Sequence, residues 1–296
     1  MRFCPWDLAW NGVVPLFLFL IAPIDFASGF EAGASNQYPP CLLCGYMTAA
    51  LPPAGWYFED TMLYEHLTAY NNRSERTTTR YSIWANITKV IWIADFPLLG
   101  ANWGASLSQP IAYGDVKIAE SGVKRWGMTD TAIVPAYLSW NLGSDLFVAA
   151  GFGVYIPDGS FNKQRALNVG DEFWTVEPVA AVTYLPDGWN LSLSATVDFN
   201  TRNAARQTTS GNVLYVDYTI EREILGWEIG ISGDWLQQLT HDQGPWSRAD
   251  EQQIVIGPVI GHMIGNVDVQ LIYVHDLISR NTGGGDNLTL RFRGPF

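Results

Sequence analysis

The stretch that decides the fold is Trp189-Asn190-Leu191-Ser192-Leu193-Ser194-Ala195-Thr196-Val197-Asp198-Phe199-Asn200. Apolar side chains occupy every second position from Leu191 to Phe199, and polar side chains fill the positions between them. Because successive side chains of a strand point to opposite faces, this segment predicts a strand with one apolar and one polar face. The same alternation recurs at 227–235, 267–273 and 287–293. An all-β, antiparallel fold follows.

The spacing of the connections predicts how the strands are joined. Short turns are expected near 265–266, 223–226, 186–188, 141–144 and 95–100, and long connections near 279–286, 239–250, 201–211, 158–170, 110–127 and 71–78. This layout gives about 12 strands over residues 55–296, with both ends of the sheet on the side of the short turns. Bacterial outer-membrane barrels have short periplasmic turns and long external loops, and closure of the sheet pairs every backbone group in lipid. We therefore expect a transmembrane β-barrel.

The strands of a soluble β-sandwich with aromatic residues in its core would also alternate. The N-terminal segment helps to decide between this sandwich and a membrane barrel. A single Arg2, an apolar run from Val13 to Ile24 and the small residues Ala27-Ser28-Gly29 predict a signal peptide over residues 1–29. The run is shorter than the ~20 residues of a membrane-spanning helix. Export together with the loop pattern favours the barrel over the sandwich. The predicted location is the outer membrane of a Gram-negative bacterium.

Composition fits this location and excludes some partners. The chain has 13 Trp and 13 Tyr, which suit the aromatic girdles of a membrane barrel. Loss of Arg2, Asp7 and Asp25 with the signal leaves 16 basic and 27 acidic residues, a formal charge of −11. Nucleic acid is not an expected partner, because its phosphates need a basic surface. The expected partners are outer-membrane lipid and, through the last strand ending at Phe296, the barrel-assembly machinery.

Residues 30–54 precede the first predicted strand and form a separate element, either a plug in the barrel lumen or a periplasmic segment. Cys41 and Cys44 lie within it, between two Pro-Pro pairs. In an oxidising compartment this pair is expected to form a disulfide or to remain as two inert thiols. Two further ligands would be needed for zinc, so we predict no metal. No cofactor is expected either.

The histidines do not predict an enzyme. His241-Asp242 with a loop residue such as Ser247 could be built into a base and a nucleophile. Adjacent residues do not usually face each other, however, and we interpret the pair as part of a solvated external loop. We predict no catalytic residues.

Polar residues near the external mouth or on the inward face of the predicted strands are the candidates for solute contact. Gln237, Gln238 and Asp242 lie near the expected external mouth, where an entering solute would meet them. The other candidates, which could equally pair with one another for structural reasons, are Asp234, Glu228, Asp198 and Arg291.

Runs spread over nearly the whole mature chain carry a family resemblance. They are Phe30–Asn36, Leu51–Phe58, Tyr113–Val116, Gly153–Gly159, Asn168–Gly170, Trp174, Pro178, Thr183–Trp189, Ser210-Gly211, Trp235–Asp242 and Ile256–Pro258. Together they make the chain similar to the family named for the meta pathway of phenol degradation. The resemblance implies an outer-membrane protein with a transport role, often encoded beside enzymes that degrade aromatic compounds. Asp158 stands where members commonly have Thr, and the cysteine pair is not typical of the family.

From these observations we expect a channel for small hydrophobic, aromatic compounds. Two alternatives stay open. One is a general diffusion pore for small hydrophilic solutes, which an acidic lumen would bias towards cations. The other is a structural or adhesive barrel with a closed lumen and partner-binding loops.

Overall fold

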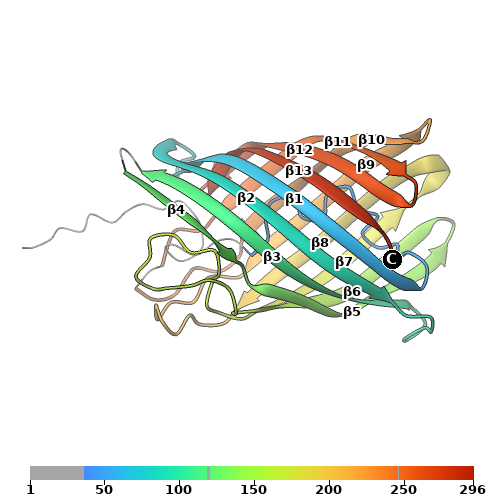
Figure 1. Ribbon diagram of the computed structural model, residues 1–296, viewed down its shortest axis with the longest axis horizontal. Coiled ribbons are helices and arrows are strands. Elements are labelled where there is room, and N and C mark those ends of the chain that lie inside the picture. The colour runs from blue at the N-terminus through green and yellow to red at the C-terminus, as the bar shows by residue number, and fades with distance from the viewer. Residues whose placement is uncertain (1–36, 119–120, 246) are drawn as a thin grey trace, which may run out of the picture.

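A closed antiparallel barrel dominates the computed structural model, which describes residues 37–118, 121–245 and 247–296 (Figure 1). Neighbouring strands in the sequence pair with each other, and β1 pairs with β13 to close the sheet. Within these ranges the strands are β1 (Gly55–Tyr70), β2 (Arg76–Ile93), β3 (Asn102–Ile118), β4 (Ser121–Met128), β5 (Thr131–Gly143), β6 (Leu146–Ile156), β7 (Thr175–Tyr184), β8 (Trp189–Asn200), β9 (Val213–Ile224), β10 (Trp227–Gln238), β11 (Gln252–Ile264), β12 (Val267–Arg280) and β13 (Gly283–Pro295), with one short 3-10 turn, η1 (Pro186–Gly188).

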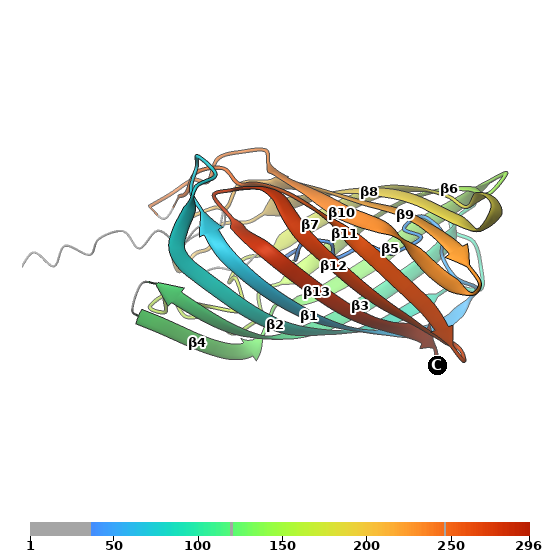
Figure 2. The ribbon, with the colours of Figure 1, turned by 90° about the horizontal axis from the view of Figure 1, so that it is seen from above.

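The described strands fill 12 positions around the barrel, as the sequence predicted. β4 and β5 share one position, because β3 pairs with β5 through residues 102–108 and with β4 through residues 111–118. Thr129 and Asp130 interrupt the shared position. The outer end of β3 and β4 thus forms a hairpin that extends from the wall (Figure 2).

The apolar faces of the strands point away from the lumen, which distinguishes the barrel from a sandwich. Leu193 is 46% exposed on the outer face, whereas the adjacent Ser194 is 1% exposed on the inner face. The barrel strands other than β4 have 10 to 18 residues, and about 9–11 residues of tilted strand cross a bilayer. An outward apolar surface of this length fits lipid, so the sandwich alternative is wrong.

The two ends of the barrel differ in their connections. The C-terminus lies at the end with the short turns (Figure 1). At one of these turns Leu225 and Gly226 both have positive φ, 55° and 80°, the backbone that a two-residue hairpin turn requires. Trp56, Trp189 and Trp227 stand exposed at the first residues of their strands on this side. Exposed tryptophans at one end of the strands are typical of the aromatic girdle of a membrane barrel.

Two predicted long connections are wrong, and the one predicted at 71–78 is shorter, since only residues 71–75 lie between β1 and β2. Residues 110–118 and 121–127 belong to the paired strands β3 and β4, and residues 279–286 are nearly all strand, joined by Asn281 and Thr282. Gly283, within the predicted connection 279–286, pairs with Ala69 of β1. The edge of β1 would otherwise carry unpaired backbone groups, and closure of the sheet removes them. The long connections after β6, β8 and β10 are present.

Residues 37–54, here called the plug segment, lie inside the ring of strands rather than beneath it (Figures 1 and 2). They form a chain of turns and contain no helix. No helix in the described part of the chain is long and apolar enough to cross a membrane. The predicted signal peptide, residues 1–29, lies outside the described residues and stays a prediction.

Candidate functional site: an apolar chamber beside a plugged lumen

The plug segment is bound to the polar inner wall of β7–β10. Its backbone N–H groups donate to side chains of the wall: Gly45 N to Thr219 Oγ1 at 2.9 Å, and Ala49 N to Thr183 Oγ1 at 2.9 Å. Tyr38 donates its hydroxyl to Asp217. Burial raises the pKa of Tyr38 well above its usual value, so the phenol keeps its proton. The inward polar side chains of these strands therefore replace water as partners of the plug backbone.

Arg291 of β13 is the principal cation that holds the plug segment. Its Nη1 donates to Cys44 O at 2.7 Å and its Nη2 donates to Leu42 O at 2.9 Å. The guanidinium carbon also lies 4.2 Å from the centre of the Tyr46 ring. A planar group with several donors suits this role, since one side chain satisfies two carbonyl oxygens and an aromatic face.

Cys41 and Cys44 form a disulfide within the plug segment, with their Cα atoms 4.9 Å apart. A carboxylate oxygen of Asp217 lies within 4.8 Å of both sulfur atoms, a grouping that could suggest a metal centre. The sulfurs are bonded to each other, however, and only thiolates ligate metal. The disulfide therefore fits a structural role in the turn of the plug.

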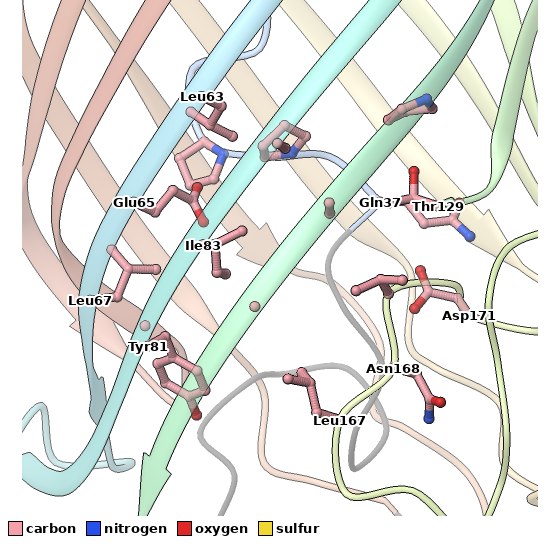
Figure 3. Close-up of a pocket in the computed structure, with 18 of the residues that line it drawn as sticks. Gln37, Leu63, Glu65, Leu67, Tyr81, Ile83, Thr129, Leu167, Asn168 and Asp171 are labelled. Atoms are coloured by element: carbon pink, nitrogen blue, oxygen red, sulfur yellow. The ribbon is translucent and has the colours of Figure 1, made fainter. Parts of the chain in front are cut away.

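An apolar cavity of about 220 Å³ lies on the other side of the plug segment, and we call it the chamber. Its wall is formed by inward residues of the first three strands, among them Leu63, Leu67, Ile83, Ala85, Ala112 and Val116. Pro39 and Pro40 of the plug segment close one side, and Leu167 and Val169 of the β6–β7 connection close another. Figure 3 shows side chains from β1 and β2 facing Leu167 and Asn168 across this space. An apolar cavity of ~150 Å³ can hold benzene, so the chamber is large enough for a single aromatic ring.

The β6–β7 connection is fixed over the chamber by Asp130, at the interruption between β4 and β5. One oxygen of Asp130 accepts the N–H of Gly159 at 2.9 Å, and the other accepts the N–H of Asp171 at 3.1 Å. Gln37 of the plug segment donates to the second oxygen at 3.2 Å. Asp130 therefore ties the wall, the loop and the plug together at the edge of the chamber.

Asp158 is part of the same attachment. Its two oxygens accept the N–H and the hydroxyl of Thr131, at 2.9 and 2.7 Å. Leu167 in turn packs against β3: a Cβ atom at Gly114 would come within 3.2 Å of the Leu167 Cδ2 atom. The first residue of β5 thus fixes one end of the loop that covers the chamber.

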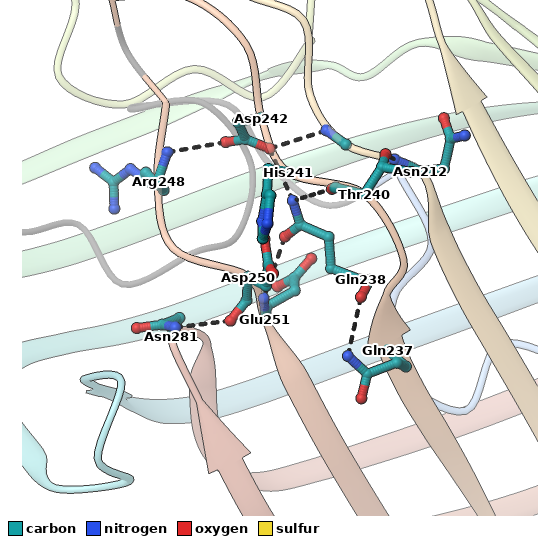
Figure 4. A network of polar contacts seen from close by, with 11 residues as sticks. Asn212, Gln237, Gln238, Thr240, His241, Asp242, Arg248, Asp250, Glu251 and Asn281 are labelled. Atoms are coloured by element: carbon teal, nitrogen blue, oxygen red, sulfur yellow. Dashed lines mark hydrogen bonds and ion pairs between the residues drawn. The ribbon is translucent and has the colours of Figure 1, made fainter.

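Among the residues predicted from sequence, Gln238 and Asp242 are brought together, but in a brace between loops. Gln238 Nε2 donates to Asp242 Oδ1 at 2.9 Å. Asp242 also accepts the backbone N–H groups of Gly211 and Arg248, at 2.8 and 3.1 Å (Figure 4). Burial raises the pKa of Asp242, while these N–H groups act in the opposite direction. These contacts connect the β8–β9 and β10–β11 loops.

Gln237 lies apart from this brace. It is next to Gln238 on β10, and adjacent strand residues point to opposite faces, so Gln237 lies on the outer face. Its Nε2 donates to the carbonyl oxygen of Gln238 at 2.9 Å. The expectation that both glutamines face an entering solute conflicts with this arrangement.

The remaining predicted residues face the lumen but not the chamber. Asp198 and Asp234 are fully buried, and Glu228 accepts a hydrogen bond from Gln270 at 3.1 Å. With Arg291, they belong to the polar side of the lumen. None of the predicted site residues is among the described residues that line the chamber.

The loop histidine does not form the arrangement that a hydrolase needs. His241 Nδ1 lies 2.7 Å from Asp250 Oδ1, and Ser247 Oγ donates to Gly244 O at 2.6 Å. A nucleophile requires a base within hydrogen-bond reach, and these contacts leave His241 and Ser247 with other partners. The interpretation as a solvated loop agrees with this geometry.

Sequence reasoning missed the chamber, although a signal was present. Thr61–His66 and Ile87–Ile93 alternate poorly, because apolar residues occur on both faces of the strands. Leu63 and Ile87 are buried on the inner face, while Met62 is 50% exposed on the outer face. Weak alternation in an otherwise regular barrel thus indicates an apolar patch of lumen wall rather than an irregular strand.

Comparisons with solved structures support the fold. An outer membrane channel from Pseudomonas putida F1 is similar, with 16% identity and a TM-score of 0.72, over 84% of this chain and 98% of that chain. The translocator domain of the autotransporter NalP from Neisseria meningitidis has 9% identity and a TM-score of 0.51, over 84% of this chain and 91% of that one. The transport unit of the autotransporter AIDA-I from Escherichia coli has 10% identity and a TM-score of 0.50, over 82% and 90%. At these identities the likeness concerns the barrel fold alone.

The family is identified by a match of the sequence to a family model. No curated protein matched the sequence. A family model described as "Putative MetA-pathway of phenol degradation" matches residues 68–292, which is most of the chain and includes β2–β12. The chain, a membrane-spanning barrel with a plugged lumen and an apolar chamber, therefore belongs to this family, as the resemblance of its motifs indicated.

Proposed function

We propose that this protein is an outer-membrane channel for small hydrophobic, aromatic-sized solutes, which pass through the chamber. The observation that carries the proposal is an apolar cavity within the lumen of a membrane barrel, bounded by the plug segment and the β6–β7 connection. Ligand sites are mostly apolar and concave, with a few polar groups that fix orientation. The similar channel from Pseudomonas putida F1 supports the assignment to transport. No step of catalysis is needed for this role.

A substitution that fills the chamber tests the proposal. Ala112 lines the chamber, and the preceding Ile111 is 48% exposed on the outer face of the same strand. Uptake of radiolabelled toluene would be measured in intact cells with a lipopolysaccharide outer leaflet, with and without the protein. We expect the wild-type protein to raise uptake, Ala112→Trp to return it to background and Ile111→Trp to leave it unchanged.

The same cells distinguish the alternatives. An equal rise in uptake of a small sugar and of toluene would support the general diffusion pore instead. The plug segment, which occupies the lumen, is the observation against that pore. No uptake of any solute by a folded barrel would support the closed, adhesive barrel.

A further inference from the structure

The chamber contains one carboxyl group for which the proposed function gives no role so far. Glu65 projects from the inner face of β1 into the chamber, between Leu63 and Leu67 (Figure 3). It is 5% exposed, and its Oε1 has no hydrogen-bond partner within the described structure. Burial of a polar group without a partner is unfavourable, and a carboxyl group is among the costliest to leave in this state. An atom of this kind in an apolar cavity points to a ligand that supplies the missing hydrogen.

Glu65 is not needed to hold the wall or the plug segment. Its inward neighbour Glu59, six residues earlier on the same strand, forms an ion pair with Lys89 at 3.0 Å and receives the hydroxyl of Tyr46. The residues beside Glu65 across the sheet are Asn287 of β13 and Ile83 of β2. Neither supplies a cation. The two carboxyl groups thus differ: Glu59 is fully engaged in structure, whereas Glu65 faces the cavity.

Two other buried polar atoms at the chamber also have no hydrogen-bond partner in the described structure. Gln37 Oε1, from the plug segment, is also buried without a partner among the described residues, although its Nε2 is bound to Asp130. On the loop side Asn168 accepts the N–H of Asn162 at 2.9 Å, while its buried Nδ2 has no partner in the described structure. Two acceptors, Glu65 Oε1 and Gln37 Oε1, and one donor, Asn168 Nδ2, are therefore available to a ligand in this apolar cavity.

The charge of the lining sets a second limit on the ligand. Glu65 and Asp130 line the chamber, and the described lining contains no lysine or arginine. An aromatic carboxylate would bring a negative charge towards these groups with no cation to offset it. A neutral ring with a hydroxyl or amino group would bring a hydrogen-bond donor and no charge.

We propose that Glu65 is a specificity-determining residue of the channel, which accepts a hydrogen bond from the hydroxyl or amino group of a small neutral aromatic solute. The inference rests on the proposed function, because it assigns the solute class of the same chamber. The channel then prefers donor-bearing rings over hydrocarbons of equal size, and it rejects aromatic carboxylates. An unmet polar group in a site disfavours ligands that cannot pair with it, by about tenfold for one neutral hydrogen bond.

Binding to the purified full-length barrel in detergent tests this inference with three probes: benzyl alcohol, ethylbenzene and benzoate. Benzyl alcohol and ethylbenzene are similar in size and differ in the hydroxyl donor. We expect the wild-type protein to bind benzyl alcohol about tenfold more tightly than ethylbenzene, and benzoate not measurably. Equal affinity of the wild-type protein for benzyl alcohol and ethylbenzene would overturn the inference without any variant.

Two variants assign the preference to Glu65. Glu65→Leu should lower benzyl alcohol affinity about tenfold and raise that for ethylbenzene, because the unpaired acceptor is gone. Glu65→Gln keeps a carbonyl acceptor, so benzyl alcohol should still bind, and benzoate binding should become detectable. Tyr64→Leu, on the adjacent outward residue, is the matched control and should change none of the affinities. Retained preference for benzyl alcohol in Glu65→Leu would contradict the role of this residue.

The two proposals fail in different ways. If toluene uptake in cells stays at background and the purified barrel binds none of the probes, the proposed function itself fails. If uptake depends on the chamber but Glu65 variants bind all probes like the wild-type protein, only the solute preference fails.

Discussion

The two sides of the lumen are built from one alternating sheet, yet their inward side chains do different things. On the side of β7–β13 many of these side chains are polar and bind the plug segment, as Thr219 and Arg291 do, and apolar ones such as Val259 pack against it. On the side of β1–β3 many of them are apolar and leave a cavity, as Leu63 and Ala112 do. The comparison shows that alternation determines which residues face the lumen, whereas their chemistry determines whether the lumen is filled or open to a solute.

The largest expected effect comes from removing the anchor on the polar side. Arg291→Met leaves the carbonyl oxygens of Leu42 and Cys44 without partners, which we expect to destabilise the plugged state by about 3 kcal/mol. The plug segment should then loosen, and single-channel conductance of small ions in planar bilayers should rise several-fold. Arg280→Met, at an exposed position of β12, is the control and should conduct like the wild-type protein. Unchanged conductance of Arg291→Met would show that other contacts hold the plug.

The next effect concerns the loop that covers the apolar side. Asp130→Ala removes the acceptor of the Gly159 and Asp171 N–H groups. We expect the free energy that holds the β6–β7 connection in place to fall by about 2 kcal/mol. Trypsin cleavage after Lys163, an exposed residue of this loop, should accelerate in the folded barrel. Glu223→Ala, exposed near the opposite end of the barrel, should leave the cleavage rate unchanged. Equal rates for both variants would remove the assigned role of Asp130.

A smaller effect should follow from the brace between the external loops. Asp242→Ala removes the acceptor of Gly211 and Arg248, so amide hydrogen exchange at these two residues should accelerate, by an amount equivalent to about 1–2 kcal/mol. Toluene uptake should not change, because Gln238 and Asp242 do not line the chamber. A fall in uptake would place the external loops on the path of the solute and would break the comparison between the two sides.

The smallest effect is the titration of His241. A hydrogen bond to Asp250 and the negative charge of that residue raise the pKa of His241. The stabilising interaction is fully present below the pKa of a free histidine and is lost as the pH rises through the raised value. Side-chain NMR should show a raised pKa that Asp250→Asn lowers, with little change in stability because the ring is exposed. An unaltered titration in Asp250→Asn would exclude the pair in solution.

Much of the barrel could be predicted from the sequence, because the relevant information is local. Leu193 and Ser194 already indicate opposite faces, and the turn at Leu225 and Gly226 is a local signal as well. The pairing of Gly283 with Ala69 could not be predicted in this way. Three successive glycines resemble a hairpin tip, and the partner strand lies at the other end of the chain.

The candidate site was harder to predict, because its residues have ordinary apolar side chains. Leu63 and Ala112 are suitable for a strand in any setting, and their role depends on a space that the plug segment leaves empty. Gln238 and Asp242 were predicted as solute contacts because they are polar residues near the mouth. In the structure Gln238 donates to Asp242, and Asp242 accepts backbone N–H groups of two loops. A sequence shows which groups can form hydrogen bonds, but not which ones are already satisfied.

The plug segment and the last strand of the barrel meet where Arg291 binds the plug segment. The plug precedes β1 directly, Arg291 lies in β13, and β1 pairs with β13 to close the sheet. During biogenesis, a barrel whose last strand has not yet paired with its first would lack these contacts of Arg291 with the plug segment. We therefore expect the Arg291 contacts with the plug segment to form only when the wall is completed.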